Sequence, residues 1–302
     1  MPCPYSPAAD LFWMTIILIT FFCRKPFLTT TPPLPDTAPA ETSAPAPRKR
    51  RPPRRVEVSR IEVLSPAMRR ITLTGTELEG FAAPGPASYI KLIFPEPGQT
   101  EPVRPLPDGP RAVSMRTYTP LAVRPEALKV DVDFVLHGEG PASSWAAQAS
   151  VGQVLFLMGP GPGYTLDADA PHHLLIADDS ALPAVETILA ALPATARVQV
   201  LLEVIAAAEE RTLHSPAQLD VTWLARGTDH RAAGLPTEKA LRALPAIAPD
   251  TQIYLACEAA AMRRIRTLLT GELGVSRQQI VGRGYWKLDV MNHPDHDYGE
   301  DA

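Results

Sequence analysis

The chain has 302 residues, a formal net charge of −4 and 45% hydrophobic residues, which is enough for two domains with separate cores. The net negative charge argues against nucleic acid as a partner of the whole surface. The three cysteines, Cys3, Cys23 and Cys257, are too scattered to indicate a disulfide framework or a zinc or iron–sulfur cluster. A redox role would therefore depend on a bound organic cofactor.

The N-terminal segment does not have the pattern of a folded domain. Its apolar run, residues 11–23, is shorter than the roughly twenty residues that span a bilayer. Asp10 precedes this run and Arg24 follows it, which is not the charge pattern of a signal peptide. We predict that residues 1–53 form a disordered, Pro- and Thr-rich extension and that the protein is cytoplasmic; a weak membrane anchor is the alternative.

Alternation of apolar and polar residues predicts short strands between residues 54 and 168. The clearest lie at 56–63, 70–74, 89–94, 130–135 and 154–158. Glycines and prolines separate them, as is typical of small barrels. We predict an antiparallel β-barrel over residues 54–168.

The run from Arg116 to Pro120 combines a cation, an aromatic ring and a hydroxyl at the end of a predicted strand. Arg116 can bind a phosphate or flavin oxygens, Tyr118 can lie against an isoalloxazine ring, and Thr119 can hydrogen-bond the flavin edge near its reactive nitrogen. Alternation places Arg116 and Tyr118 on one face, and Pro120 is expected to end the strand ladder. These residues indicate a site for a dinucleotide flavin; an ordinary edge strand with a solvated arginine is the alternative.

A glycine-rich segment, residues 137–145, follows this run. Gly138 and Gly140 let the backbone pass close to a ligand, and Pro141 suits the first residue of a helix. The N–H groups of that first turn, together with two serine hydroxyls, would attract an anion. Because it comes soon after the flavin motif, we interpret this segment as a pyrophosphate site.

Strands that alternate with helices predict a parallel α/β domain over residues 169–290. The strands are expected at 173–177, 198–205, 220–224, 252–256 and 280–286, and helices at 181–192 and 260–269. The acidic tail, residues 291–302, is predicted to be disordered. Its histidines lack a rigid element that would hold a metal, so we assign no metal site.

Ligands of parallel sheets bind beyond the carboxyl ends of the strands. A nicotinamide cofactor would place its pyrophosphate near the start of the 181–192 helix, where Asp178 and Asp179 would repel it unless they pair with an arginine. Glu203 would accept hydrogen bonds from ribose hydroxyls and would repel a 2′-phosphate, which favours NADH over NADPH if a nicotinamide binds. A plain strand-end carboxylate is the alternative for Glu203.

The two motifs, in this order, resemble those of the siderophore-interacting protein family, which are FAD-binding relatives of the ferredoxin reductases. The resemblance covers residues 54 to 287 and includes the segments 51–58, 177–184, 256–259 and 284–287. The chain departs from the family at Leu288-Asp289, where a glycine usually follows the Tyr-Trp pair.

The resemblance implies reduction of ferric siderophores, with FAD taking electrons from NAD(P)H or a ferredoxin and passing them singly to Fe(III). No acid, base or nucleophile is required, so we name no catalytic residue. The expected cofactor-binding residues are Arg116, Thr117, Tyr118, Thr119, His137, Gly138, Gly140, Pro141, Ala142, Ser143, Ser144, Asp179, Ser180, Tyr285 and Trp286. The expected contacts with the anionic siderophore are Lys91, Arg111, Arg264 and Lys287, each with a solvated surface charge as the alternative.

Two other functions are compatible with the sequence. One is a general NAD(P)H-dependent flavin or ferredoxin reductase, against which the acidic Asp178-Asp179 turn counts. The other is a module that binds flavin or siderophore without turnover.

Overall fold

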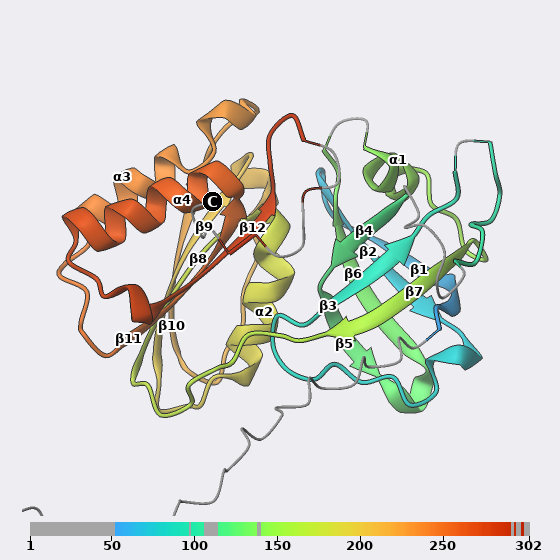
Figure 1. The fold of residues 1–302 in the computed structure, drawn as a ribbon, viewed down its shortest axis with the longest axis horizontal. Coiled ribbons are helices and arrows are strands. Elements are labelled where there is room, and N and C mark those ends of the chain that lie inside the picture. Colours follow the sequence, from blue (N-terminus) through green and yellow to red (C-terminus); the bar gives the residue numbers. More distant parts are fainter. Residues whose placement is uncertain are drawn as a thin grey trace, which may run out of the picture. The chain divides into compact units, whose positions relative to one another are not determined.

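The computed structural model describes residues 52–96, 98–105, 114–137, 140–290, 293 and 297–298. These residues form one seven-stranded and one five-stranded sheet (Figure 1). The apolar run at 11–23, Arg111 and Gly138 lie outside the described residues. Within the described part of the chain, no helix combines the length and the apolar character that crossing a membrane requires.

The first sheet is antiparallel and has the strand order β4-β3-β7-β1-β2-β6-β5. Its strands are β1 (Arg54–Ser65), β2 (Met68–Thr74), β3 (Tyr89–Ile93), β4 (Met115–Tyr118), β5 (Pro120–Arg124), β6 (Lys129–Val135) and β7 (Val154–Gly161). Alternate side chains point inward, as in the pairs Ile71 with Leu73 and Val132 with Phe134, and all four are completely buried. The alternation that was visible in the sequence therefore builds the core of this sheet.

One detail of the predicted barrel is wrong. Pro120 does not end the ladder but begins β5, where its partner is Val132 on β6. Proline is compatible with the first residue of an edge strand, because the N–H that it lacks is not needed there. β4 and β5 are therefore consecutive strands, with only Thr119 between them.

The connection at Thr119 explains why the sheet is closed. β4 and β5 form the two opposite edges of the sheet, yet one residue joins them. The sheet must curl until its edges meet, which gives the predicted barrel. We call the segment from Arg116 to Pro120 the barrel seam.

The second sheet is parallel and has the strand order β10-β9-β8-β11-β12. Its strands are β8 (His172–Asp178), β9 (Arg197–Val204), β10 (Gln218–Ala225), β11 (Thr251–Glu258) and β12 (Ile280–Trp286). Among the described residues, the α-helices are α1 (Pro141–Ala147), α2 (Leu182–Ala191), α3 (Leu235–Ala243) and α4 (Ala259–Thr267). All five predicted strands are present, and α3 is an addition that the sequence analysis missed.

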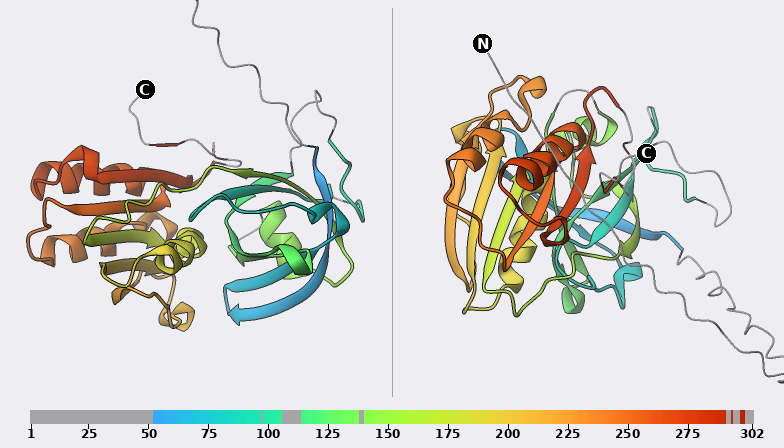
Figure 2. Two further views of the ribbon diagram at one scale, coloured as in Figure 1. Left: turned by 90° about the horizontal axis from the view of Figure 1, so that it is seen from below. Right: turned by 60° about the vertical axis from the view of Figure 1, so that its left-hand side comes forward.

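Helices cover both faces of this sheet (Figures 1 and 2). Leu175 and Ala177 of β8 pack in one core with α2, whereas Leu174 and Ile176 pack in another with α3 and α4. A strand that is buried on both faces is a continuous apolar run, which is why the 173–177 segment was recognisable. The core under α2 also includes Met68 and other barrel residues.

Polar contacts connect the barrel to the parallel-sheet domain. The Arg211 guanidinium contacts Asp133 of β6 at 3.1 Å and Glu186 of α2 at 2.8 Å. The Thr187 hydroxyl of α2 accepts a hydrogen bond of 2.9 Å from the backbone N–H of Ala87. α2 is thus held to the barrel by both charge and hydrogen bonding.

Candidate functional site

The barrel seam presents the predicted flavin-binding side chains. Arg116 and Tyr118 are half-buried on β4, and Thr117 between them is exposed, as the predicted alternation requires. Burial lowers the pKa of the Arg116 guanidinium, while the Tyr118 phenol and Glu96 partly offset this effect. A cation that has lost hydration in this way is stabilised by an anion, which fits a phosphate or an electron-rich ring edge.

An aromatic cluster brings the two sequence motifs together. The Tyr118 ring lies 4.5 Å from Phe134, and the Trp145 ring of α1 lies 5.2 Å from Phe94. Phe94 and Phe134 are themselves neighbours, with ring centroids 6.3 Å apart. Sequence reasoning missed both phenylalanines, although each lies in a predicted strand. The cluster fixes α1 beside the barrel seam.

α1 begins at Pro141, as predicted, and Gly140 is its N-cap. Ala142 and Ser143 are buried in its first turn, Ser144 is half-buried, and the Ser143 hydroxyl accepts a 2.9 Å hydrogen bond from the backbone N–H of His137. First-turn N–H groups have no acceptor within a helix, so they are available to an anion. At the other end, Arg69 donates hydrogen bonds to the carbonyls of Ala146 and Ala147.

The carboxyl ends of the parallel strands carry four buried acids, Asp178, Asp179, Glu203 and Glu258, which we call the carboxyl edge. Asp178 accepts hydrogen bonds from the backbone N–H and the hydroxyl of Ser180. Its other oxygen accepts from the Glu258 N–H at 3.0 Å and from the Trp286 indole at 2.8 Å. Both carboxylate oxygens of Asp178 therefore accept hydrogen bonds, and these join β8 to β11 and β12.

Asp179 faces an arginine. The sequence predicted that this acidic turn would repel a pyrophosphate unless its carboxylates pair with such a residue. Its carboxylate lies 3.2 Å from the Arg226 guanidinium, and both side chains are buried. Burial, and then the neighbouring Asp178, raise the pKa of Asp179 to about 7, although Arg226 opposes the shift. Asp179 and Ser180 thus make contacts within the chain at the position where a nicotinamide pyrophosphate was expected.

Glu203 and Glu258 cap helices. Glu203 accepts hydrogen bonds from the Gly234 N–H and from the Thr237 hydroxyl at the start of α3, and it is 2% exposed. Glu258 accepts from the Ala261 N–H at the start of α4. Glu203 therefore makes these contacts within the chain, and this geometry does not support the ribose contact.

The aromatic pair Tyr285 and Trp286 ends β12 between these two regions. Trp286 is held by Asp178 and meets the His230 ring edge to face, with centroids 5.8 Å apart. The Tyr285 hydroxyl lies 2.9 Å from that of Tyr254 on β11. Tyr285 therefore joins the last strand to its neighbour within the sheet.

The predicted siderophore-binding residues have different surroundings. Lys91 lies on β3 opposite Thr117 of the barrel seam, with its ammonium 5.9 Å from the centre of the Tyr89 ring. Lys287 is exposed in the turn after β12. Arg264 instead joins α4 to α3, because it donates to Glu238 at 2.9 Å and to the Ala233 carbonyl at 2.6 Å.

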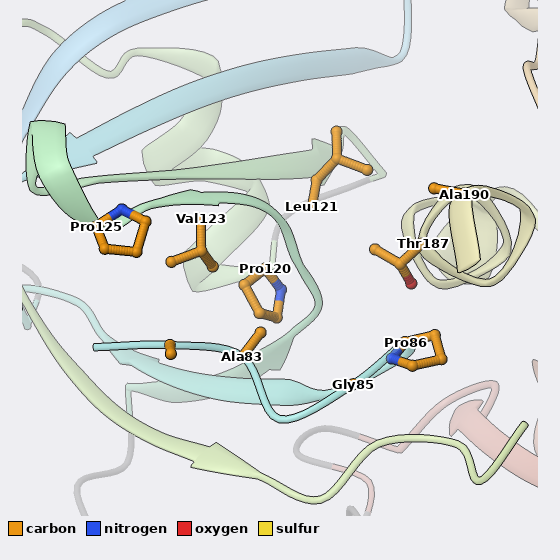
Figure 3. A pocket seen from close by; sticks show the side chains of 10 residues that line it. Ala83, Gly85, Pro86, Pro120, Leu121, Val123, Pro125, Thr187 and Ala190 are labelled. Atoms are coloured by element: carbon orange, nitrogen blue, oxygen red, sulfur yellow. The ribbon is translucent and has the colours of Figure 1, made fainter. Parts of the chain in front are cut away.

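An open pocket of about 400 Å³ lies between β5 and α2 (Figure 3). Its lining is mostly aliphatic and includes Pro86, Pro120, Val123 and Thr187. The Thr187 hydroxyl is already used by Ala87 and Ala184. None of the predicted cofactor- or siderophore-binding residues lines this pocket.

Comparisons with known proteins all match this chain to one protein family. The family model "Siderophore-interacting FAD-binding domain" matches residues 57–164, and "Siderophore-interacting protein" matches residues 170–289. The ferric vibriobactin reductase ViuB of Vibrio cholerae is 31% identical over 242 residues, which cover 78% of this chain and 89% of that protein. The NADPH-dependent ferric-chelate reductase of Escherichia coli is 29% identical and covers 77% of this chain and 92% of its own length.

A solved structure agrees with these matches. The siderophore utilization protein from T. fusca superposes with a TM-score of 0.73 at 32% identity, covering 82% of this chain and 98% of that chain. The predicted fold, an antiparallel FAD-binding barrel followed by a ferredoxin-reductase-like parallel sheet, is confirmed. The chain belongs to the siderophore-interacting protein family and is an FAD-dependent oxidoreductase.

Proposed function

We propose that this protein holds FAD at the barrel seam and reduces ferric siderophores, so that iron leaves as Fe(II). The observation that carries this proposal is the aromatic cluster of Tyr118, Phe94, Phe134 and Trp145. It keeps β4, which carries the predicted flavin-binding residues, next to the first turn of α1, where the pyrophosphate site is predicted. One elongated dinucleotide could contact both.

The residues present fit FAD. Tyr118 offers an aromatic surface beside the half-buried Arg116, and Thr119 adds a hydroxyl at the point where the barrel closes. The first turn of α1 would hold the pyrophosphate through its N–H groups and the Ser144 hydroxyl. Tyr285, at the end of β12, would border the flavin from the parallel-sheet domain.

Bound FAD would supply the conversion between two-electron and one-electron transfer. Siderophores hold Fe(III) through hard anionic oxygens, and those ligands hold the less charged Fe(II) more weakly. The protein's own task is to bring an anionic complex close to the flavin edge. Lys91 is suited to this because it lies one strand from Thr117, and Lys287 is suited because it is exposed. We leave Arg264 out of this surface because Glu238 already offsets its charge.

The carboxyl edge bears on the choice of electron donor. Its acids are buried and already accept hydrogen bonds from Ser180, Gly234, Thr237 and Trp286. Beside them, Nε and Nη1 of the buried Arg226 side chain have no hydrogen-bond partner. The preference for NADH over NADPH loses its basis, since it depended on Glu203. The acidic turn pairs with Arg226, so NAD(P)H and a ferredoxin are both proposed as donors to the flavin.

A general flavin reductase is the second candidate. It would require NAD(P)H to bleach the flavin quickly, as the name of the Escherichia coli relative implies for that protein.

The test is anaerobic visible spectroscopy of the full chain loaded with FAD, with a ferrous-iron chelator present. NADH, NADPH and a reduced ferredoxin are supplied in turn, with and without a ferric siderophore, and free FAD serves as the blank. We expect the ferrous chelate to form only when the siderophore and a competent donor are both present. Reduced protein-bound flavin that leaves the ferric siderophore intact would refute the proposal.

A pair of matched variants tests the substrate surface. Lys91→Ala should raise the siderophore KM several-fold and leave kcat unchanged, because it removes attraction and not electron transfer. Lys239→Ala, an exposed lysine on α3, should leave both constants unchanged. Equal effects of the two substitutions would remove Lys91 from the substrate surface.

A further inference from the structure

Part of the C-terminal segment lies against three arginines. Arg263 and Arg266 are on α4, and Arg283 is on β12, which packs beside that helix. Nη2 of Arg263 donates to both carboxylate oxygens of Asp297, at 2.8 and 2.9 Å, and the Asp297 side chain is 9% exposed. We call the surface formed by these three arginines the arginine surface.

Backbone groups of the same segment add to this contact. The Asp297 carbonyl accepts a hydrogen bond of 2.8 Å from the N–H of Gly284 on β12, and the Tyr298 carbonyl accepts one of 3.0 Å from Arg266. The guanidinium carbon of Arg283 lies 5.7 Å from the centre of the Tyr298 ring. A side chain at Gly284 would crowd the contact, because its Cβ would lie 3.0 Å from an Asp297 carboxylate oxygen. An edge strand, a charged pair and an aromatic ring thus hold this segment, as they would hold a separate peptide.

The sequence of this segment is acidic. Residues 291–302 contain Asp295, Asp297, Glu300 and Asp301 and no lysine or arginine. The attraction between such a segment and the arginine surface is electrostatic, so it does not require that both belong to one chain. The arginine surface is therefore suited to an acidic protein, and Asp297 of the chain's own tail binds part of it.

The arginine surface adjoins the connection between the two domains. Arg283 donates a hydrogen bond of 3.3 Å to the carbonyl of Gly163, which lies between the last barrel strand and β8. Tyr285, two residues further along β12, is the residue that would border the flavin. A protein that docks on the arginine surface would therefore lie beside the strand that leads to the proposed flavin site.

We propose that the arginine surface is the docking site of an acidic iron–sulfur electron donor and that the C-terminal tail competes with this donor. The inference rests on the proposed function, because it concerns the delivery of electrons to the same flavin. The donor's carboxylates would replace Asp297 as partners of Arg263. Because the tail belongs to the same chain, its effective concentration is on the order of millimolar, and it lowers the donor's apparent affinity without contacting the flavin.

The experiment measures how tightly an oxidised, acidic [2Fe–2S] ferredoxin binds the full chain, by isothermal titration calorimetry at low ionic strength. Asp297→Ala should tighten ferredoxin binding several-fold, because it removes the carboxylate that competes for Arg263. The matched control is Glu272→Ala. Glu272 also accepts from one arginine through both carboxylate oxygens, at 3.0 and 3.1 Å, but its partner is Arg242 on α3. The control should leave the affinity unchanged.

Two further variants separate competition from a general change in structure. Arg263→Ala should weaken ferredoxin binding, and adding Asp297→Ala to it should bring no gain, because the cation for which the carboxylates compete is absent. If far-UV circular dichroism shows that Asp297→Ala does not fold, a chain that ends at Val290 removes the whole competing tail. That chain should bind ferredoxin more tightly than the full chain.

Three results would each overturn the inference: no ferredoxin binding to any variant, equal affinities for Asp297→Ala and Glu272→Ala, or a gain from Asp297→Ala that persists in the Arg263→Ala background. A reduced flavin that leaves the ferric siderophore intact would instead refute the proposed function. The two failures are distinguishable, because the binding measurement uses no siderophore and requires no electron transfer.

Discussion

The barrel seam and the carboxyl edge are both rich in polar residues, but they use them differently. At the seam, Arg116 and Tyr118 are half-buried and line the proposed flavin site. At the carboxyl edge, Asp178 and Glu203 are each 2% exposed and accept several hydrogen bonds from their own chain. The polar groups of the carboxyl edge therefore hold strands and helices together, whereas those of the barrel seam are the ones that we propose to bind a ligand.

If this contrast is correct, a substitution at the carboxyl edge should lower the free energy of unfolding and leave FAD binding unchanged. Asp178→Ala would leave the N–H of Glu258, the indole of Trp286 and both donors of Ser180 without their acceptor. We expect a loss of about 5 kcal/mol in the free energy of unfolding, measured by urea denaturation. The folded fraction should still bind FAD.

Asp178→Asn is the control for this prediction. It retains one carbonyl oxygen for the Ser180 donors and should cost roughly half as much. A folded Asp178→Ala protein without FAD would show that the carboxyl edge belongs to the cofactor site, contrary to the comparison.

A substitution at the barrel seam should have the opposite effect. Arg116→Ala should weaken FAD binding on the order of a hundredfold, because it removes the cation expected to contact the flavin or its phosphate, and it should leave the far-UV circular dichroism unchanged. The measurement is the FAD content after gel filtration. The double variant that carries Arg116→Ala and Tyr118→Ala should be colourless. Because Tyr118 no longer packs on Phe134, its melting temperature should also fall. Unchanged flavin content in the double variant would reject the site.

The carboxyl edge should also give stability a distinctive pH dependence. The folded-state pKa of Asp179 is raised to about 7, above an unfolded value of about 3.9. Between these values the folded chain binds one proton more than the unfolded chain, so this group lowers stability as pH rises toward 7 and has a constant effect above it.

The comparison of wild type with Asp179→Asn isolates this contribution from other titrating groups. From pH 5 to pH 7, the wild-type free energy of unfolding should fall by on the order of 2 kcal/mol relative to that of the variant. Parallel pH profiles in urea denaturation would show that Asp179 is ionised throughout, as a surface carboxylate would be.

The smallest expected effect concerns the contact between the domains. Arg211→Met removes a partly buried cation shared by Asp133 and Glu186, and we expect a loss of about 1 kcal/mol in the free energy of unfolding. Arg242→Met, which breaks an exposed pair with Glu272, should produce no measurable change. Equal results for the two variants would mean that the Arg211 contact behaves as a surface ion pair.

Sequence patterns predicted the strands well because their periodicity is local. The 173–177 run and the alternation at 130–135 correspond directly to β8 and β6. β5 was missed because Pro120 was interpreted as the end of a ladder, and α3 was missed because only Thr237 and Leu241 of that helix are buried, which gives a weak apolar pattern.

The predictable part of the candidate site was also local. Arg116, Tyr118 and Thr119 are close together in the sequence, so their shared chemistry could be recognised. The ribose interpretation of Glu203 is not supported, because its partners Gly234 and Thr237 lie on another element. The Tyr254–Tyr285 contact depends on a strand register and a bulge, neither of which the sequence reveals.

The single residue between β4 and β5 limits how this barrel can vary in length. Thr119 joins two strands whose registers are set by β3 and β6. An insertion or deletion at this point would shift one strand by one position, and such a shift moves every side chain of that strand to the opposite face. The barrel seam should therefore accept substitutions but no change in length, whereas the longer connections elsewhere in the barrel have room for both.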